Sequence, residues 1–251
     1  MSDHGSALMD EQTLRYKLTA GMRGLYEALA SDVSGRILLE TPVVHVAHDA
    51  QSATVTCADG RIVLADAVVV TIPIGALGNV TFEPELAPEQ QTLIADGSNS
   101  TGFKIWIKVA GHQSVIAGAP GKHPISLLRS EKFLDDENAT ILVGFGSDHT
   151  AIDFDDIASA QKAVDVWAAG LEVLGCGGHD WVADEWSGQT WATLRSGQFF
   201  HGWTAFHDTR TRLRFAGADF AKGWNGVVVD GAIESGIRTA RVLLRDLSSE
   251  V

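Results

Sequence analysis

The sequence predicts a mixed α/β fold, in which an α/β domain is interrupted by a β-rich insert. The segment 212–247 carries a short apolar strand, a turn with Gly217 and Trp224, and a long amphipathic helix. The segment 103–109 alternates strictly between apolar and polar side chains, as a half-buried strand does. The segment 67–71 is apolar on both faces, which predicts a strand enclosed between two layers.

The first part of the chain predicts one helix followed by several strands. Residues 1–15 are polar and predict a linking segment, and a short helix is expected from Gly21. A strand is expected within 35–49, which is rich in β-branched residues. The runs 53–57 and 61–64 flank Ala-Asp-Gly and predict a hairpin, and Pro73 ends the strand at 67–71.

The middle of the chain predicts the β-rich insert. Residues 81–88 hold two prolines and predict a loop, and further strands are expected at 124–129 and 140–147. Asp155 or Asp156 can cap a helix that runs to Gly175. An aromatic-rich stretch then leads into the last strand.

The terminal helix carries one apolar stripe and one charged side. Acidic residues come first and basic residues last on the charged side, which suits the helix dipole. The stripe recurs at three- and four-residue steps, at Val229, Ala232, Ile233, Gly236, Ile237, Ala240, Leu243, Leu244 and Leu247.

Composition and charge exclude several classes of partner. The formal net charge is −13 and no basic cluster occurs, so nucleic acid and anionic membrane surfaces are not expected partners. No apolar run reaches the roughly 20 residues that span a bilayer, and the polar start predicts no signal peptide. Cys57 and Cys176 lack metal or redox spacing, so we expect a cytoplasmic protein.

A series of motifs resembles the flavin-containing monoamine oxidase family along essentially the whole chain. In order they are GMRGLYEALA, TPVVHV, ADAVVVTIPIGAL, STGFKIWIKV, HDWVADEWSGQTWATL and RFAGADFAKGWNGVVVDGAIESG. The last motif is most similar to the bacterial 6-hydroxynicotine oxidase branch. The resemblance implies an FAD-binding domain in residues 1–76 and 207–251, interwoven with a substrate domain in residues 77–206.

One family feature is missing from the sequence. The Gly-x-Gly-x-x-Gly motif, which brings a helix N-terminus to the cofactor pyrophosphate, does not occur. The resemblance therefore implies that the N-terminal βαβ dinucleotide unit is missing, and we expect a truncated product, one half of a split enzyme, or a fragment. A separate chain or a partner copy would then have to supply that unit.

The resemblance also assigns site residues. Lys104 matches a lysine that holds a water against the flavin, and Trp191 matches one wall of an aromatic cage around the amine. Without the resemblance, Lys104 on a solvent-facing strand side and Trp191 in a core are the simpler interpretations. The residues implied to bind the cofactor are Val43, Thr71, Pro73, Gly217, Asp219, Trp224, Gly226, Val227 and Val228.

The second wall of the cage departs from the family pattern. Val227 or Val228 stands where many members have an aromatic residue, unless Trp224 or Trp203 takes its place. We therefore expect Trp203 and Val227 to contact the substrate beside Trp191. Thr190 stands where some members have a flavin-linked cysteine, which implies non-covalent FAD.

The activity implied is oxidation of a small primary or secondary amine to an imine, with O2 as acceptor and release of H2O2. A non-catalytic remnant or assembly module of the same fold is the alternative, and a polyene-type desaturase is a third interpretation. A hydrolase is disfavoured because no Gly-x-Ser-x-Gly occurs. A metal site is disfavoured because His179, His201 and His207 lack ligand spacing.

Overall fold

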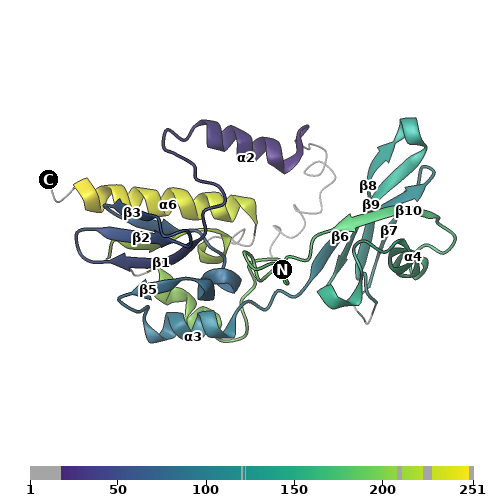
Figure 1. Cartoon of the computed structure of the whole chain (residues 1–251). Coiled ribbons are helices and arrows are strands. Elements are labelled where there is room, and N and C mark those ends of the chain that lie inside the picture. Colours follow the sequence, from purple (N-terminus) through teal and green to yellow (C-terminus); the bar gives the residue numbers. More distant parts are fainter. Residues whose placement is uncertain (1–17, 120, 122, 208–210, 223–227, 249–251) are drawn as a thin grey trace. The chain divides into compact units, whose positions relative to one another are not determined.

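The computed structural model describes residues 18–119, 121, 123–207, 211–222 and 228–248 (Figure 1). The chain divides into two compact units, Met1–Thr41 and Pro42–Val251. In the first unit, helix α2 (Gly21–Ser31) confirms the expected helix, and none of its residues is buried. Met22, Tyr26 and Leu29 are among its exposed apolar side chains.

The second unit begins with a four-stranded sheet in the order β3-β2-β1-β5. Strands β1 (Val43–His48), β2 (Ala53–Cys57) and β3 (Ile62–Ala65) are antiparallel neighbours, and β5 (Thr81–Glu83) runs parallel to β1. Gly60 closes the β2–β3 hairpin at a φ of 84°, which confirms that prediction. The strand expected within 35–49 is confined to β1.

Strands distant in sequence form a two-stranded parallel sheet. β4 (Val68–Val70) pairs with β11 (Leu213–Phe215), so the terminal segment returns to the first part of the unit. β4 is less enclosed than its composition predicts, because Val69 is 39% exposed.

The first hydrophobic core lies around these two sheets. It also takes side chains from the 3-10 turn η1 (Ile74–Asn79), helix α3 (Pro88–Asp96) and the 3-10 turn η4 (Trp203–Phe206). The segment 81–88 is therefore not only a loop, since it contains β5 and leads into α3. The buried members of the core are Val46, Val70, Ile74, Leu77, Val80, Phe82, Leu86, Leu93, Trp203, Phe206, Leu213, Phe215 and Phe220.

Helix α6 (Val229–Ser248) confirms the terminal helix but turns its apolar stripe outward. An apolar stripe normally faces the core. Here the buried residues are Gly231, Ser235 and Thr239, which are small enough for the helix to lie close to β11. The Thr239 hydroxyl donates to the carbonyl of Phe215 at 3.3 Å. Apolar spacing predicts the stripe correctly, and close packing of small residues decides which face is buried.

The second hydrophobic core belongs to a five-stranded sheet in the order β10-β6-β9-β8-β7. The strands are β6 (Phe103–Ala110), β7 (Ile116–Gly118), β8 (Leu127–Leu134), β9 (Ala139–Gly146) and β10 (Val173–Gly178). The alternation predicted for 103–109 is confirmed, because Phe103, Ile105, Ile107 and Val109 are all buried.

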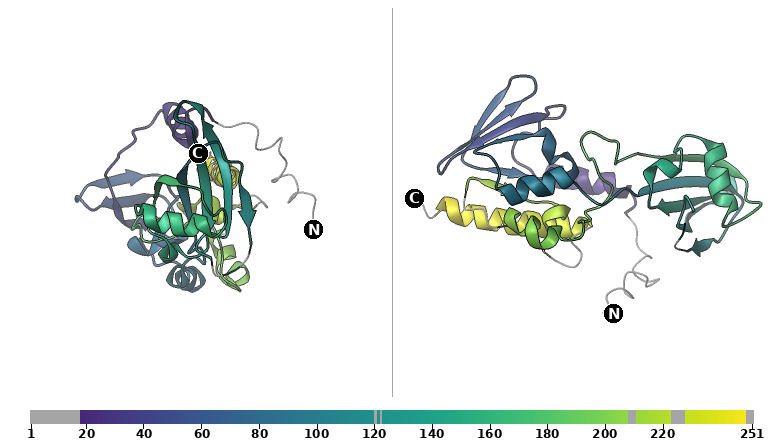
Figure 2. Two further views of the ribbon diagram at one scale, coloured as in Figure 1. Left: turned by 90° about the vertical axis from the view of Figure 1, so that its right-hand side faces the viewer. Right: turned by 90° about the horizontal axis from the view of Figure 1, so that it is seen from below.

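Helix α4 (Ile157–Asp165) lies against this sheet (Figure 2). Asp156 is its N-cap and accepts from the N–H groups of Ala158 and Ser159 at 3.0 and 3.1 Å. The predicted extension of the helix to Gly175 is wrong, because Val173–Gly178 forms edge strand β10. Apolar residues continue with helical spacing after Asp165, but pairing with β6 draws the later ones into the sheet.

The two cores share no buried residue. Leu77, Leu93 and Trp203 belong to the first core, although the predicted substrate domain begins at residue 77 and ends at residue 206. The predicted boundaries at 76 and 206 stay a proposal, and the second core occupies the narrower stretch 103–173.

Candidate active site

Lys104, Phe145 and Trp191 form a cluster on the sheet face opposite the second core. Lys104 and Phe145 are cross-strand partners on β6 and β9, so both side chains leave the same face. The Lys104 ammonium lies 5.3 Å from the centre of the Phe145 ring and 5.8 Å from that of Trp106. The Trp191 ring stacks on Phe145 at 6.4 Å between centroids, with 30° between planes. The arrangement is an exposed cation beside aromatic surfaces.

The Trp191 ring is placed by a close approach to Gly102. A Cβ at residue 102 would lie 2.4 Å from a carbon of the Trp191 ring, so a larger residue would displace the indole. The backbone N–H of Trp191 donates to the Ser100 hydroxyl at 2.8 Å. The Thr190 hydroxyl donates to the carbonyl of Gly102. Trp191 is therefore held at both its ring and its backbone.

A buried glutamine links this wall to the terminal strand and turn. The Gln189 amide nitrogen donates to both carboxylate oxygens of Asp219 at 3.0 Å, and the Gln189 oxygen accepts from the N–H of Gly75 at 2.8 Å. Asp219 also accepts from the N–H of Ile74 at 3.0 Å. Burial raises the pKa of Asp219, although these hydrogen bonds act in the opposite direction. Three distant segments, 73–75, 187–191 and 217–219, thus meet at one polar centre.

Two of these segments also cross through their backbones, and the third is tied to α6. A Cβ at Gly75 would lie 2.7 Å from the carbonyl oxygens of Ser187 and Gly188, so only glycine fits this crossing. The Pro73 carbonyl accepts from Ala76 and starts the turn η1. Gly217 has a φ of 126°, and its N–H donates to the Ser235 hydroxyl of α6 at 3.3 Å.

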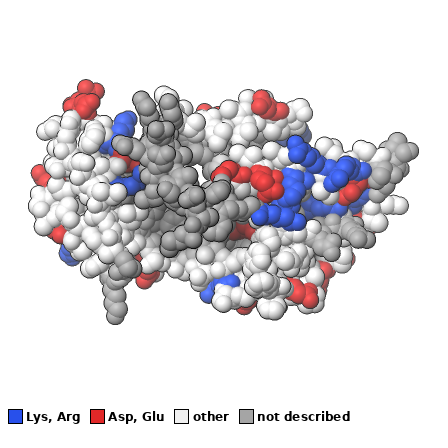
Figure 3. All heavy atoms as spheres, turned by 180° about the vertical axis from the view of Figure 1, so that it is seen from behind, with Lys and Arg blue, Asp and Glu red and all other residues white. Residues whose placement is uncertain are grey.

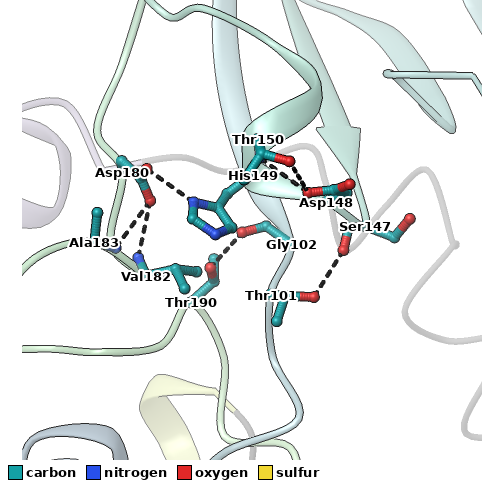
Figure 4. Close-up of polar contacts among 10 residues, drawn as sticks. All are labelled: Thr101, Gly102, Ser147, Asp148, His149, Thr150, Asp180, Val182, Ala183 and Thr190. Atoms are coloured by element: carbon teal, nitrogen blue, oxygen red, sulfur yellow. Dashed lines mark hydrogen bonds and ion pairs between the residues drawn. The ribbon is translucent and has the colours of Figure 1, made fainter.

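A histidine–aspartate pair closes the end of the five-stranded sheet beside Gly102 and Thr190 (Figure 4). His149 Nδ1 lies 2.8 Å from the Asp180 carboxylate, and the His149 N–H donates to the Thr101 carbonyl. Burial opposes ionisation of Asp180, but hydrogen bonds from His149 and from the N–H groups of Ala183 and Val182 outweigh it and lower the pKa. This pair connects the end of β9 to the chain after β10.

The predicted site residues therefore fall into two groups that Gln189 connects. Lys104 and Trp191 lie together on the sheet face, whereas Pro73, Gly217 and Asp219 lie around the polar centre, with Thr71 next to them. Val43 starts β1 and packs against the first core. Val228 is 46% exposed and precedes α6, while Trp224, Gly226 and Val227 lie outside the described residues.

Trp203 is placed in the core and not on the sheet face. It is 9% exposed, stacks on Phe199, and donates its indole N–H to the Asp219 carbonyl at 2.7 Å. This position supports the turn that carries Asp219 and gives no support to the predicted contact between Trp203 and substrate, which stays a prediction.

Sequence reasoning missed Phe145 and Gln189. The strand carrying Phe145 is predictable, but its pairing with Lys104 depends on the register between β6 and β9. No local sequence pattern marks Gln189, because its hydrogen-bond partners are distant in sequence. Gly75 lies 114 residues before it and Asp219 lies 30 residues after it.

Comparisons with known proteins agree with this architecture. The Pseudomonas sp pseudooxynicotine dehydrogenase is 33% identical over 94% of this chain and 48% of its own length. The (S)-6-hydroxynicotine oxidase of Paenarthrobacter nicotinovorans is 29% identical over 86% of this chain and 49% of its own. A putrescine oxidase double mutant superposes with a TM-score of 0.77 at 18% identity, covering 90% of this chain and 53% of that one.

A family model described as flavin containing amine oxidoreductase matches residues 3–244, and the chain belongs to that family. The expected resemblance is confirmed, including its link to a 6-hydroxynicotine oxidase. The chain spans about half the length of the curated relatives it matches. Within the described residues, no helix combines the length and apolar character needed to cross a bilayer.

The residues present fit one side of a flavin. The Lys104 ammonium makes no ion pair with any described residue, so its N–H donors remain available beside the aromatic rings. The Asp219 carboxylate, in contrast, is already engaged by Gln189 and Ile74. The chemistry of these residues is therefore compatible with the ring system of a flavin, and the sequence holds no glycine motif for its diphosphate.

Proposed function

We propose that this chain carries the amine-binding side of an FAD-dependent amine oxidase, which oxidises a small primary or secondary amine to an imine. The observation that carries the proposal is the cluster of Lys104, Phe145 and Trp191 on the open face of the sheet. FAD, when bound, would supply the two-electron chemistry: the hydride that leaves the carbon beside the amine nitrogen would go to the cofactor as the nitrogen loses a proton, and O2 would then take up two electrons and two protons to give H2O2.

The residues of the chain would bind and orient the amine. The rings of Phe145 and Trp191 offer flat, weakly hydrated surfaces to the amine nitrogen and its alkyl carbons. Lys104 would hold a water molecule through its free N–H donors and supply positive charge. The N-terminus of α6 would favour negative charge on a nearby group. Phe145 provides the second aromatic surface that Val227 and Val228 cannot.

Binding of FAD would be non-covalent at Thr190. Its hydroxyl donates to the Gly102 carbonyl and is not a thiol that could form a link to flavin. The pyrophosphate-binding unit would come from polypeptide outside these 251 residues, because the matching relatives are about twice as long. A cytoplasmic location stays part of the proposal and rests on the free thiols of Cys57 and Cys176.

The electron acceptor distinguishes an oxidase from a dehydrogenase. The relatives include proteins named dehydrogenases and one named an oxidase. Peroxide release in air, compared with reduction of an artificial acceptor under nitrogen, separates the two cases.

The decisive test is spectroscopic. Purified chain mixed with FAD and the pyrophosphate-binding half of a relative should show a protein-bound flavin absorption band. Addition of a small amine under nitrogen should bleach that band, and a polyene should not. A protein that stays colourless under these conditions would instead be the non-catalytic remnant or assembly module.

A further inference from the structure

Trp106 is a large side chain that belongs to neither hydrophobic core. It lies on β6 between Lys104 and Lys108, on the face opposite the second core, because successive residues of a strand point to opposite faces. Its side chain is 43% exposed. The two lysines are about 13 Å apart along the strand. The structure gives their ammonium groups different partners.

Lys108 is held by a carboxylate. Its ammonium forms an ion pair with Glu137, just as the guanidinium of Arg214 pairs with Asp246 at 2.8 Å. Figure 3 shows a group of Lys and Arg side chains on one face of the molecule, with Asp and Glu side chains beside it. A carboxylate holds a cation in place, but it offsets the positive charge and engages the N–H donors.

Lys104 is held by aromatic rings instead. Its ammonium lies 5.3 Å from the centre of the Phe145 ring and 5.8 Å from that of Trp106, and it forms no ion pair with a described residue. Both distances are within the roughly 6 Å at which a ring face attracts an ammonium group. Phe145 is the cross-strand neighbour of Lys104, and Trp106 follows two residues along the same strand. The two rings therefore border Lys104 in two directions.

The other side of Lys104 along the chain is bounded by Trp191. The Trp191 ring occupies the space that a Cβ of Gly102 would fill, and it stacks on Phe145. Residues 102, 104 and 106 are successive positions on one face, since side chains alternate along a strand. Two indole rings thus stand before and after Lys104, with the Phe145 ring across from it.

Ring faces hold a cation in a different way from carboxylates. The attraction comes from the quadrupole of the ring, so the ring carries no formal charge that would offset the cation. An exposed lysine without any partner samples many rotamers. The rings of Trp106 and Phe145 therefore restrict the Lys104 ammonium while leaving its positive charge uncompensated.

We propose that Trp106 is a positioning residue, which together with Phe145 fixes the Lys104 ammonium without neutralising it. The inference rests on the proposed function, because this ammonium is the group that would hold a water molecule beside the flavin. Loss of the Trp106 ring would let the Lys104 side chain turn toward solvent with its charge unchanged.

The first measurement uses the chain alone, without cofactor. NMR spectra of chain labelled with carbon-13 lysine report the ε-methylene protons, and Lys104→Met identifies the Lys104 signal by its loss. Protons over the face of an aromatic ring are displaced to lower frequency. We expect the Lys104 signal to lie outside the range of the other lysines. It should move toward that range in Trp106→Leu and stay displaced in Trp106→Phe.

A matched control separates the contact from general effects on the sheet. Phe133→Leu removes another exposed aromatic ring from the same sheet, on β8, and should leave the Lys104 signal unchanged. Trp106→Phe retains an aromatic ring and serves if the leucine variant does not fold.

The second measurement uses the chain reconstituted with FAD as in the spectroscopic test. Trp106→Leu should slow the half-reaction that Lys104→Met slows by roughly two- to fivefold, the factor that corresponds to one cation–π contact. Trp106→Phe should retain most of the rate. In the Lys104→Met background Trp106→Leu should have no further effect, because both substitutions act through the same ammonium group.

Three results would overturn the proposal. The first is a Lys104 signal within the range of the other lysines in the parent, and the second is a displaced signal that Trp106→Leu leaves unchanged. The third is equal slowing by Trp106→Leu in the parent and in Lys104→Met, which would mean that Trp106 acts on the amine directly. A displaced signal that depends on Trp106, in a protein without flavin chemistry, would support the positioning role and contradict only the proposed function.

Discussion

At the scale of single residues, the site depends on polar side chains whose partners are distant in sequence. Gln189 satisfies the Gly75 N–H and both oxygens of Asp219 at once. Loss of one partner from such a buried set costs more than one ordinary hydrogen bond, because the remaining groups stay desolvated. The position of Trp191, two residues after Gln189, is thereby tied to the turn at Asp219.

Lys104→Met tests the proposed role of the ammonium. We expect amine oxidation or flavin reoxidation in the reconstituted enzyme to slow by roughly tenfold or more, because a charged donor beside the reacting atoms is lost. Stopped-flow measurement of both half-reactions shows which step changes. Lys108→Met is the matched control, since Lys108 lies on the same strand and pairs with Glu137. Equal rates in the parent and Lys104→Met would contradict the assignment.

The raised pKa of Asp219 predicts that its contribution to the free energy of unfolding falls as pH rises. Its pKa is raised in the folded protein, so between the unfolded value of about 3.9 and the folded value the native state binds more protons than the unfolded state. The contribution of Asp219 is therefore full below the unfolded pKa and is lost as pH rises through the folded pKa.

Urea unfolding of the parent and Asp219→Asn across this range measures that contribution. The stability of the parent relative to the variant should fall as pH rises. Asp49→Asn should give the opposite slope, because hydrogen bonds from Gln51 and Ser52 lower the pKa of Asp49. If the free energies of unfolding of the parent and of Asp219→Asn changed with pH in parallel, the Asp219 carboxyl would have the same pKa in the folded and unfolded states, which would contradict the prediction.

At this scale the sequence is informative only where a family motif marks the residue. Lys104, Trp191 and Asp219 can be predicted by resemblance, and the structure brings them to two connected places. Phe145 and Gln189 cannot, because their roles depend on strand register and on a chain crossing at Gly75. Neither feature leaves a local pattern.

At the scale of elements, α6 shows how periodicity can predict a helix and still not identify its buried face. The stripe is regular, yet the helix packs through Gly231, Ser235 and Thr239. Small residues allow a close approach to β11, and the Ser235 hydroxyl accepts from Gly217. Strand β10 shows the opposite error. Its glycines predict the end of a helix, but in the structure they pair with β6 as part of a strand.

Substitutions on opposite sides of α6 test this orientation. Ser235→Leu should destabilise the protein by about 1–3 kcal/mol, because Ser235 is fully buried and a larger side chain would overpack the contact with β11. Ile233→Ser should change the unfolding free energy by about 0.5 kcal/mol or less in the chain alone, because that side chain is on the outer face. Chemical denaturation of both variants measures the difference, and a larger cost for Ile233→Ser would show that the apolar stripe is the buried face.

At the scale of the whole chain, the second unit contains two hydrophobic cores that share no buried side chain. The first collects segments from β1 to η5 (Ala218–Phe220), whereas the second is confined to the five-stranded sheet and α4. Local apolar patterns predict most of the second core, because its strands are neighbours in sequence. The first core is harder to predict, because it joins β4 to β11 across the whole insert.

This division predicts that the two cores open separately. Leu142→Ala and Leu77→Ala each remove a fully buried side chain, one from each core, and each should cost about 2–5 kcal/mol locally. Hydrogen exchange followed by mass spectrometry should show faster exchange in β6, β8 and β9 for Leu142→Ala, with β1 and β2 nearly unchanged, and the reverse for Leu77→Ala. The hydrogen bonds of Gln189 and Asp219 join segments from both regions but bury little apolar area. Loss of stability in one core should therefore have little effect on the stability of the other. Uniform acceleration across all strands in both variants would instead mean that the second unit unfolds as one cooperative body.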